Sequence, residues 1–313
     1  MPFTSQQSLP SPTGAQLNLY MREPEGAARG VVQINHGLAE HAARYARFAD
    51  FLAARGFATY AHDHRGHGGT TAPNTPPRMF GQPPAGDMVI ADVEAVHAHI
   101  AEHHPGLPVI TFGHSMGGLI ATNHTLRHPE RAAAAAIFNA QFTPGLAVAG
   151  AKAVLAWERF RLGSDAASRI IPRLTFQAWA KEIRNRRTDF DWLSRDAEEV
   201  DKYVADPLCG WDATVAMWSD LFGFITYCND DAHFAHLPRD KPLYLIGGEH
   251  DPSTEGGKLV TRFEKRLRGM GFSNLASKVY DETRHECLND INRDTVMEDF
   301  AAWAEKAIDL ASI

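Results

Sequence analysis

The chain has few cysteines, no long apolar run and no excess of basic residues. Three cysteines among 313 residues, Cys209, Cys228 and Cys287, are too few and too scattered for a disulfide framework or a cysteine-based zinc site, which indicates a reducing compartment. A formal net charge of −7 argues against binding to the phosphate backbone of nucleic acid. No apolar run approaches the roughly 20 residues that a membrane-spanning helix needs.

The start of the chain also lacks a targeting signal. The first ten residues, MPFTSQQSLP, have neither the basic start nor the apolar stretch of a secretory signal, so we expect a cytoplasmic protein. What the chain does have is 44% hydrophobic and 22% charged residues, enough to bury one large core without a second independent domain.

The most informative motif is Gly113-His-Ser-Met-Gly117, which joins a β-branched run to a helix-forming run. In a G-x-S-x-G turn the chain reverses so sharply that side chains at the two glycine positions would collide with the neighbouring strand or helix. The strained serine then presents its hydroxyl above the sheet. We interpret the motif as a nucleophile elbow with Ser115 as the nucleophile; the alternative is a glycine-rich turn with an incidental serine.

Partners for this serine follow in the order acid, then histidine. Asp251 lies in a loop after an apolar strand-like run, and His285 follows a second such run, which is the α/β-hydrolase order. His285 would take the proton from Ser115, and Asp251 would hold the imidazole in the required tautomer. Glu249 lies in the same loop and is the alternative acid.

A fourth element would stabilise negative charge on a substrate oxygen. The buried-strand pattern 30–35 ends at His36-Gly37, where a backbone N–H can point inward. Two preorganised N–H donors, those of Leu38 and Met116, are the expected oxyanion hole for acyl transfer. An ordinary strand-to-helix loop is the alternative.

Four motifs then occur together over nearly the whole chain: HGLAEHAARY at 36–45, DHRGHG at 63–68, GHSMG at 113–117 and HECLN at 285–289. The combination resembles the monoglyceride lipase and lysophospholipase group of α/β-hydrolases. The resemblance implies a triad of Ser115, Asp251 and His285 with an oxyanion hole at Leu38 and Met116. It further implies that three framework residues hold the oxyanion loop: Glu40, Arg44 and Tyr45.

The hydrophobic pattern predicts an α/β fold. Alternating strands and helices imply a mostly parallel sheet with helices on both faces and ligands at the carboxyl ends of the strands. The predicted strands are 3–9, 16–22, 31–35, 57–62 and 134–139, and the predicted helices are 44–55 and 87–103, the second capped by Asp87.

From about residue 141 to about residue 237 the strand pattern stops and helical stretches follow one another. We therefore expect a hydrolase core formed by 1–140 and 238–313, with a helical cap inserted at 141–237. Within the cap, Asp196 is expected to begin a short helix.

The cap is rich in tryptophan, which suits either an apolar acyl pocket or the cap's own core. Two histidines beside the proposed site, His36 and His114, compete with His285 for the role of base, but neither follows a last-strand signal. The residues predicted to line a substrate pocket are His36, His114, Trp157, Trp179, Trp211 and Trp218.

Two further hypotheses concern a membrane and a metal. The segment 144–161, apolar early and basic late, is a candidate for peripheral contact with a bilayer surface. The run from His62 to His67 contains three histidines and Asp63, which suggests zinc, but the spacing does not place them on one helix face. We favour a structural loop in which Asp63 bonds nearby backbone, and no metal site.

These observations predict a serine carboxylic ester hydrolase that acts, without a cofactor, on monoacylglycerol, lysophospholipid or similar acyl esters through an acyl-enzyme. The same residues would also suit an acyltransferase, a thioesterase or an amidase. A binding protein on a hydrolase scaffold is a weaker alternative, because Ser115, Asp251 and His285 are all present. The chain gives no indication of its oligomeric state.

Overall fold

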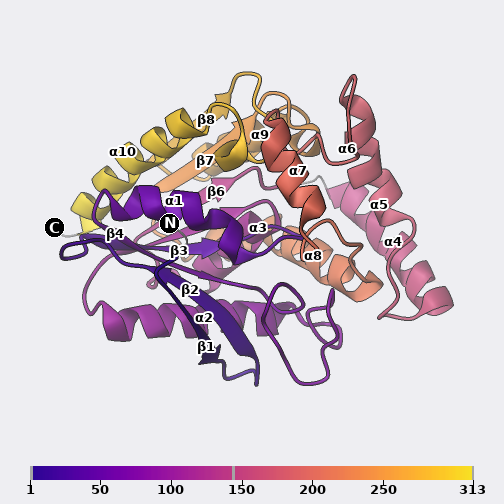
Figure 1. Ribbon diagram of the computed structural model, residues 1–313, viewed down its shortest axis with the longest axis horizontal. Helices are drawn as coiled ribbons and strands as arrows, with labels where there is room; N and C mark the ends of the chain where they lie inside the picture. The colour runs from indigo at the N-terminus through magenta and orange to yellow at the C-terminus, as the bar shows by residue number, and fades with distance from the viewer. Residues whose placement is uncertain (1–2, 143–144, 312–313) are drawn as a thin grey trace.

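One sheet of eight strands runs through the centre of the molecule (Figure 1), in the order β1-β2-β4-β3-β5-β6-β7-β8. The computed structural model describes residues 3–142 and 145–311. β1 and β2 are antiparallel to their neighbours, and the other six strands are parallel. The strands are β1 (Ser5–Pro10), β2 (Gln16–Arg22), β3 (Gly30–Asn35), β4 (Phe57–His62), β5 (Val109–His114), β6 (Ala134–Phe138), β7 (Leu243–Gly248) and β8 (Leu275–Tyr280).

Helices cover both faces of the sheet, which is why every residue of β3, β4, β5, β6 and β7 is buried. On one face lie α1 (Ala46–Ala53) and α10 (Arg293–Ala311), drawn above the strands in Figure 1. Phe48 of α1 packs between the rings of Phe112 and Phe300, at centroid distances of 5.4 and 5.0 Å.

The opposite face is covered by α2 (Gly86–His103), α3 (Met116–Arg127) and α9 (Lys258–Gly269). α9 turns Val260, Phe263 and Leu267 inward at helical spacing, so that these side chains share a core with α2 and α3. The predicted α/β-hydrolase architecture, a mostly parallel sheet with helices on both faces, is confirmed.

Two local predictions need correction. The predicted helix 44–55 is a 3₁₀ turn, η1 (Ala42–Tyr45), followed by α1. Asp87 does not cap α2, because the N-cap position is Ala85 and Asp87 lies in the first turn. The Ala85 N–H instead donates to Asp220 Oδ1 at 2.9 Å, a carboxylate of a helix far along the chain that the local sequence could not show.

The helical segment predicted after the sixth strand lies between β6 and β7, and its outer helices are drawn at the right of Figure 1. Its division from the core at 141–237 remains a prediction. As predicted, Asp196 caps one of these helices by accepting the Glu198 N–H at 3.0 Å. The elements are α4 (Gly145–Leu162), α5 (Ile171–Leu174), α6 (Phe176–Glu182), α7 (Ala197–Ala205), α8 (Val215–Cys228) and η2 (Asp231–Phe234), and we call this segment the cap.

Among the helices of the described residues, none has both the length and the apolar character that crossing a membrane requires.

The loop after β4 is held by a buried carboxylate. Asp63 accepts the backbone N–H groups of Ala42 and Gly69, each at 2.8 Å, and the side-chain amide of Asn18 at 2.7 Å. The predicted role of Asp63 in bonding nearby backbone is thus confirmed.

In and beside this loop lies a histidine cluster formed by His36, His62, His64 and His67. Their side chains are at most 2% exposed, and the His36 ring lies 4.5 Å from that of His64 and 5.0 Å from that of His67. Burial lowers the pKa of His36 to about 4 and those of His62 and His67 to about 3. The imidazoles are therefore neutral in the folded protein at neutral pH.

Because of this histidine cluster, we expect the folded protein to lose stability in mild acid. Each of these histidines binds a proton in the unfolded chain near pH 6.5 but resists it in the fold, so stability is complete above that pH and falls below it. Each proton taken up on unfolding lowers the free energy of unfolding by about 1.4 kcal/mol per pH unit. Urea unfolding followed by tryptophan fluorescence at pH 7, 6 and 5 measures the slope. His62→Gln should lower the slope of the unfolding free energy against pH by the contribution of one proton. A urea midpoint that does not change with pH would contradict the assignment.

Candidate active site

Ser115 occupies a strained turn between β5 and α3. Its φ of 55° and ψ of −119° are rare for a residue with a side chain. A Cβ on Gly113 would lie 2.1 Å from the Gly117 carbonyl oxygen, and one on Gly117 would lie 2.1 Å from the Asn35 carbonyl oxygen. The predicted steric need for both glycines is therefore confirmed.

The loops after β7 and β8 bring Asp251 and His285 together. His285 Nδ1 lies 3.0 Å from Asp251 Oδ2, and the Asp251 side chain is fully buried. The glutamate in the same loop, Glu249, is exposed and accepts the Glu282 N–H at 2.9 Å instead. The structure thus brings Asp251, and not Glu249, to the histidine.

Several donors surround the Asp251 carboxylate. Oδ2 also accepts the Asn139 amide and the Thr254 hydroxyl, each at 2.9 Å, and Oδ1 accepts the Ser253 N–H at 2.9 Å. Burial alone would raise the pKa of Asp251, but His285 and these donors together hold it below its ordinary value. The carboxylate is therefore ionised at neutral pH, in the form that can orient an imidazole.

Ser253 is a contact that the sequence analysis missed. Its hydroxyl lies 2.7 Å from Asp251 Oδ1 and 2.9 Å from His285 Nδ1, so it bridges the two side chains. Asn139, at the end of β6, is similarly placed, because its Oδ1 accepts from the Cys287 thiol at 3.0 Å while its amide holds Asp251. A single polar residue in a loop has no sequence signature, and so neither could be found from the pattern.

The loop after β3, residues 37–40, is held in place by the side chain of His36, the residue that precedes it. His36 Nδ1 lies 2.7 Å from the Gly37 carbonyl oxygen, and His36 Nε2 accepts the His64 N–H at 2.9 Å. Since the His64 N–H can only donate and the Gly37 oxygen can only accept, His36 must carry its proton on Nδ1. Because a trans peptide points its C=O and N–H in opposite directions, the N–H of Leu38 points away from the His36 ring.

A buried charge network also holds the 37–40 loop in place. Glu40 Oε1 accepts the Gly37 N–H at 2.6 Å and the Tyr45 hydroxyl at 2.9 Å, and Arg44 pairs with Glu40 Oε2 at 2.5 Å. The same guanidinium binds both oxygens of Glu286 at 2.6 Å. Burial would raise the pKa of Glu40, but Arg44 and its other partners lower it to about 2. These contacts match the framework that the family resemblance implied.

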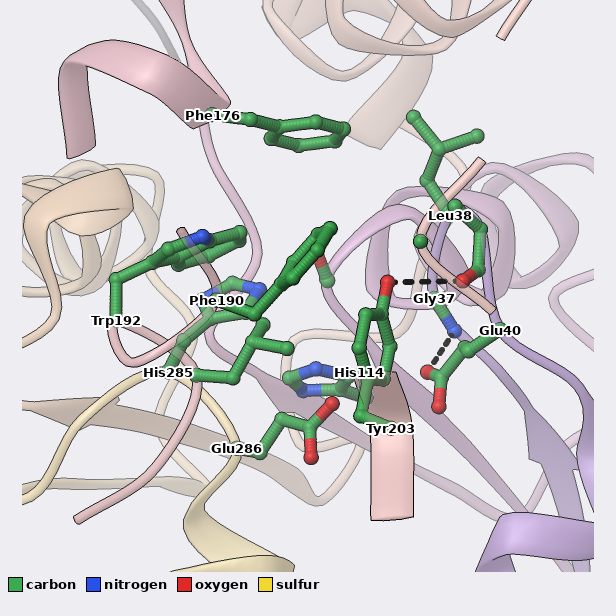
Figure 2. A pocket seen from close by; sticks show the side chains of 14 residues that line it. Gly37, Leu38, Glu40, His114, Phe176, Phe190, Trp192, Tyr203, His285 and Glu286 are labelled. Atoms are coloured by element: carbon green, nitrogen blue, oxygen red, sulfur yellow. Dashed lines mark hydrogen bonds between the residues drawn. The ribbon is translucent and has the colours of Figure 1, made fainter. Parts of the chain in front are cut away.

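A cavity opens beside Ser115 and His285 (Figure 2). The 37–40 loop and His114 form part of its wall. The remaining wall comes mainly from the cap and is largely aromatic or aliphatic: Phe176, Phe190, Trp192, Leu193 and Tyr203.

Of the six residues predicted to line a pocket, His114 lines this cavity. His36 is not in the cavity wall and instead hydrogen-bonds the Gly37 carbonyl. Trp157 is also outside the wall and is 52% exposed. The other three tryptophans pack against rings: Trp179 against Trp192 at 5.1 Å, Trp211 against His67 at 4.8 Å and Trp218 against Phe176 at 5.5 Å. Trp192, in the same segment, is the tryptophan in the wall, with its ring 4.8 Å from that of His285.

Comparison with known proteins gives consistent results. A family model described as serine aminopeptidase, S33, matches residues 26–292. Monoacylglycerol lipase of Mycolicibacterium smegmatis is 28% identical over 306 residues, covering 96% of each chain. Monoglyceride lipase of Homo sapiens is 27% identical over 215 residues, covering 66% of this chain and 61% of that protein. A carboxyl esterase of Bacillus coagulans, solved in complex with glycerol, superposes with a TM-score of 0.87 at 23% identity, covering 97% of this chain and 98% of that one.

The matched region extends from before β3 to beyond His285, so it contains every motif of the predicted resemblance. That resemblance is confirmed: the chain belongs to the serine aminopeptidase S33 family and is an α/β-hydrolase of the monoglyceride lipase group.

Proposed function

We propose that the protein is a serine carboxylic ester hydrolase. The observation that carries the proposal is the hydrogen bond from His285 to the buried Asp251, with the imidazole and the strained Ser115 lining one cavity. A carboxylate-bound imidazole beside a serine is the arrangement that activates a hydroxyl for attack on a carbonyl carbon. The names of the M. smegmatis and human relatives support the same reaction class.

The reaction proceeds in two halves through an acyl-enzyme. Ser115 Oγ attacks the ester carbonyl while His285 takes its proton, and Asp251 stabilises the imidazolium that forms. The carbonyl oxygen becomes negative and is bound by the N–H groups of Leu38 and Met116; Met116 opens α3, where first-turn N–H groups have no acceptor within the helix. His285 then protonates the departing alcohol and afterwards activates water, which releases the fatty acid and restores Ser115. No step requires a cofactor.

His114 also lines the cavity but is a poor candidate for the base. Burial and the neighbouring His285 lower its pKa to about 4, so a proton taken from serine would be held weakly. The Asp251 carboxylate is bonded to His285, as the base requires.

The wall of the cavity favours a neutral substrate with an apolar acyl chain. Its two carboxylates, Glu40 and Glu286, are both paired with Arg44, so they are occupied and do not offer a free anion to the amino terminus of a peptide. Aromatic and aliphatic side chains of the cap supply most of the remaining wall. We therefore place monoacylglycerols, lysophospholipids and similar esters ahead of peptides; acyl transfer and thioester cleavage would use the same groups.

The surface of the cap supports contact with lipid. On α4, Leu146 is 91% and Phe160 is 89% exposed, and Trp157 lies between them along the helix. Arg159 and Arg161 are exposed at the end of the same helix, where they can reach anionic headgroups. We propose that this helix rests on the surface of the lipid that contains the substrate. Pro144, with which the predicted segment 144–161 begins, lies outside the described residues.

Replacement of the nucleophile tests the proposal first. Ser115→Ala should lower kcat for a p-nitrophenyl ester by a factor on the order of 10⁶, because no other group can form the acyl-enzyme. Ser273→Ala, which removes an exposed hydroxyl before β8, is the matched control and should retain wild-type turnover. Near-wild-type activity of the Ser115 variant would disprove the assignment.

The identity of the acid can be tested with two isosteric changes in one loop. Asp251→Asn should reduce kcat by about 10⁴-fold, because the amide no longer stabilises the imidazolium or selects its tautomer. Glu249→Gln should leave kcat within about twofold, since Glu249 bonds backbone at the surface. The acid is assigned wrongly if the larger loss occurs at Glu249.

Lipid contact can be separated from catalysis by the form of the substrate. The double variant Leu146→Asp/Phe160→Asp should lose sedimentation with vesicles of phosphatidylcholine and phosphatidylglycerol, and should lose activity on monoacylglycerol in those vesicles, while hydrolysing p-nitrophenyl acetate normally. Ile291→Asp, a 63% exposed position outside the cap, is the control. Wild-type protein that remains in the supernatant would refute the contact.

A further inference from the structure

The carbonyl group of Ala39 is held by the cap rather than by the hydrolase core. The Tyr203 hydroxyl on α7 and the Gly210 N–H both donate to this oxygen, each at 2.9 Å. Figure 2 shows the phenol of Tyr203 directed at the 37–40 loop. Ala39 has φ of 57°, in the left-handed region that a residue with a side chain seldom adopts. Such a conformation persists only where its surroundings hold it.

Two more contacts join the same part of the cap to the residues that follow the loop. His41 Nε2 lies 2.8 Å from Asp206 Oδ2, and the Arg44 guanidinium lies over the Tyr203 ring at 4.8 Å from its centroid. Tyr203 is 6% exposed, and burial raises its pKa well above the usual value, so its hydroxyl is protonated and can donate at neutral pH.

The 37–40 loop therefore has three anchors, two from the core and one from the cap. Glu40 accepts the Gly37 N–H and His36 donates to the Gly37 carbonyl, and both of these come from the core. The third anchor, at the Ala39 carbonyl, comes from the cap. The peptide N–H of Leu38 lies between these fixed points, so its direction depends on all three.

We propose that Tyr203 is a positioning residue for the oxyanion hole, so that the site is complete only while the cap is closed on the 37–40 loop. This inference rests on the proposed function and assigns the cap a role beyond forming the acyl pocket. When the cap is displaced, Ala39 can leave its left-handed conformation, and the Leu38 N–H no longer points at the substrate oxygen. Ser115, His285 and Asp251 stay in place.

Tyr203 also lines the cavity, which gives a rival explanation. In that explanation its hydroxyl binds the alcohol portion of the substrate directly. The two roles differ in their dependence on the leaving group: direct binding matters only for an alcohol that carries hydroxyls, whereas an oxyanion-hole defect affects every ester.

Tyr203→Phe removes the hydroxyl and keeps the ring, and Tyr227→Phe on α8, outside the cavity wall, is the matched control. We expect Tyr203→Phe to lower kcat about tenfold to hundredfold, because small misplacements of a catalytic group have effects of this size. The loss should be equal for p-nitrophenyl butyrate and for a monoacylglycerol, with KM within about twofold. Tyr227→Phe should match the wild type.

An inhibitor pair provides a readout that loss of general stability would not change. A trifluoromethyl ketone binds serine hydrolases as a charged tetrahedral adduct, so its affinity should weaken by the same factor as kcat/KM. The corresponding unfluorinated ketone should bind as before. Amide hydrogen exchange should rise at residues 38–40 in Tyr203→Phe and not in Tyr227→Phe, and this measurement needs only folded protein.

The outcomes are distinct. An unchanged kcat in Tyr203→Phe, a loss confined to the monoacylglycerol, or exchange at residues 38–40 equal to that of the wild type would overturn the positioning role. If the wild type shows no turnover that depends on Ser115, the proposed function fails, and this inference fails with it. A loss of kcat in Tyr203→Phe shared by both esters, with the weakened trifluoromethyl ketone, supports it.

Discussion

One buried carboxylate, Asp251, has contacts that join elements far apart in the sequence, and the geometry of the candidate site depends on it. Its oxygens bond His285 after β8, Asn139 after β6, and Ser253 in its own loop. Because the carboxyl ends of parallel strands meet at one edge of the sheet, these loops converge there, next to Ser115 after β5. Burial of an anion is unfavourable unless it is fully hydrogen-bonded, so the surrounding donors keep Asp251 charged where catalysis would need it.

A second buried charge network links the core to the substrate cavity. Arg44 lies between Glu40 and Glu286, which belong to opposite ends of the chain, and its guanidinium also stacks on Tyr203 of the cap. Buried pairs of this kind fix geometry more than they stabilise the fold, since desolvation offsets much of their attraction. Here the fixed geometry is that of the 37–40 loop, which carries the N–H group of Leu38 that we propose for the oxyanion hole.

Individual residues show why the sequence predicts some parts of the candidate site and not others. Gly113 and Gly117 are required by contacts within about four residues of Ser115 and across to one neighbouring strand, so the elbow has a local signature. The choice between Asp251 and Glu249 depends on which side chain of one loop faces inward, which no pattern encodes; the family resemblance indicated Asp251. The tryptophans of the cap were identified as a group, but their individual directions depend on how its helices pack, and Ser253 has no signature at all.

In the proposed reaction the Ser115 hydroxyl forms a covalent bond to the acyl group. Rapid acid quench of the enzyme during turnover of a p-nitrophenyl ester, followed by mass spectrometry of the intact chain and of its peptides, tests this directly. We expect one added acyl group per chain, located on Ser115 and appearing before steady state is reached. Turnover without any adduct, or with the adduct on another residue, would contradict it.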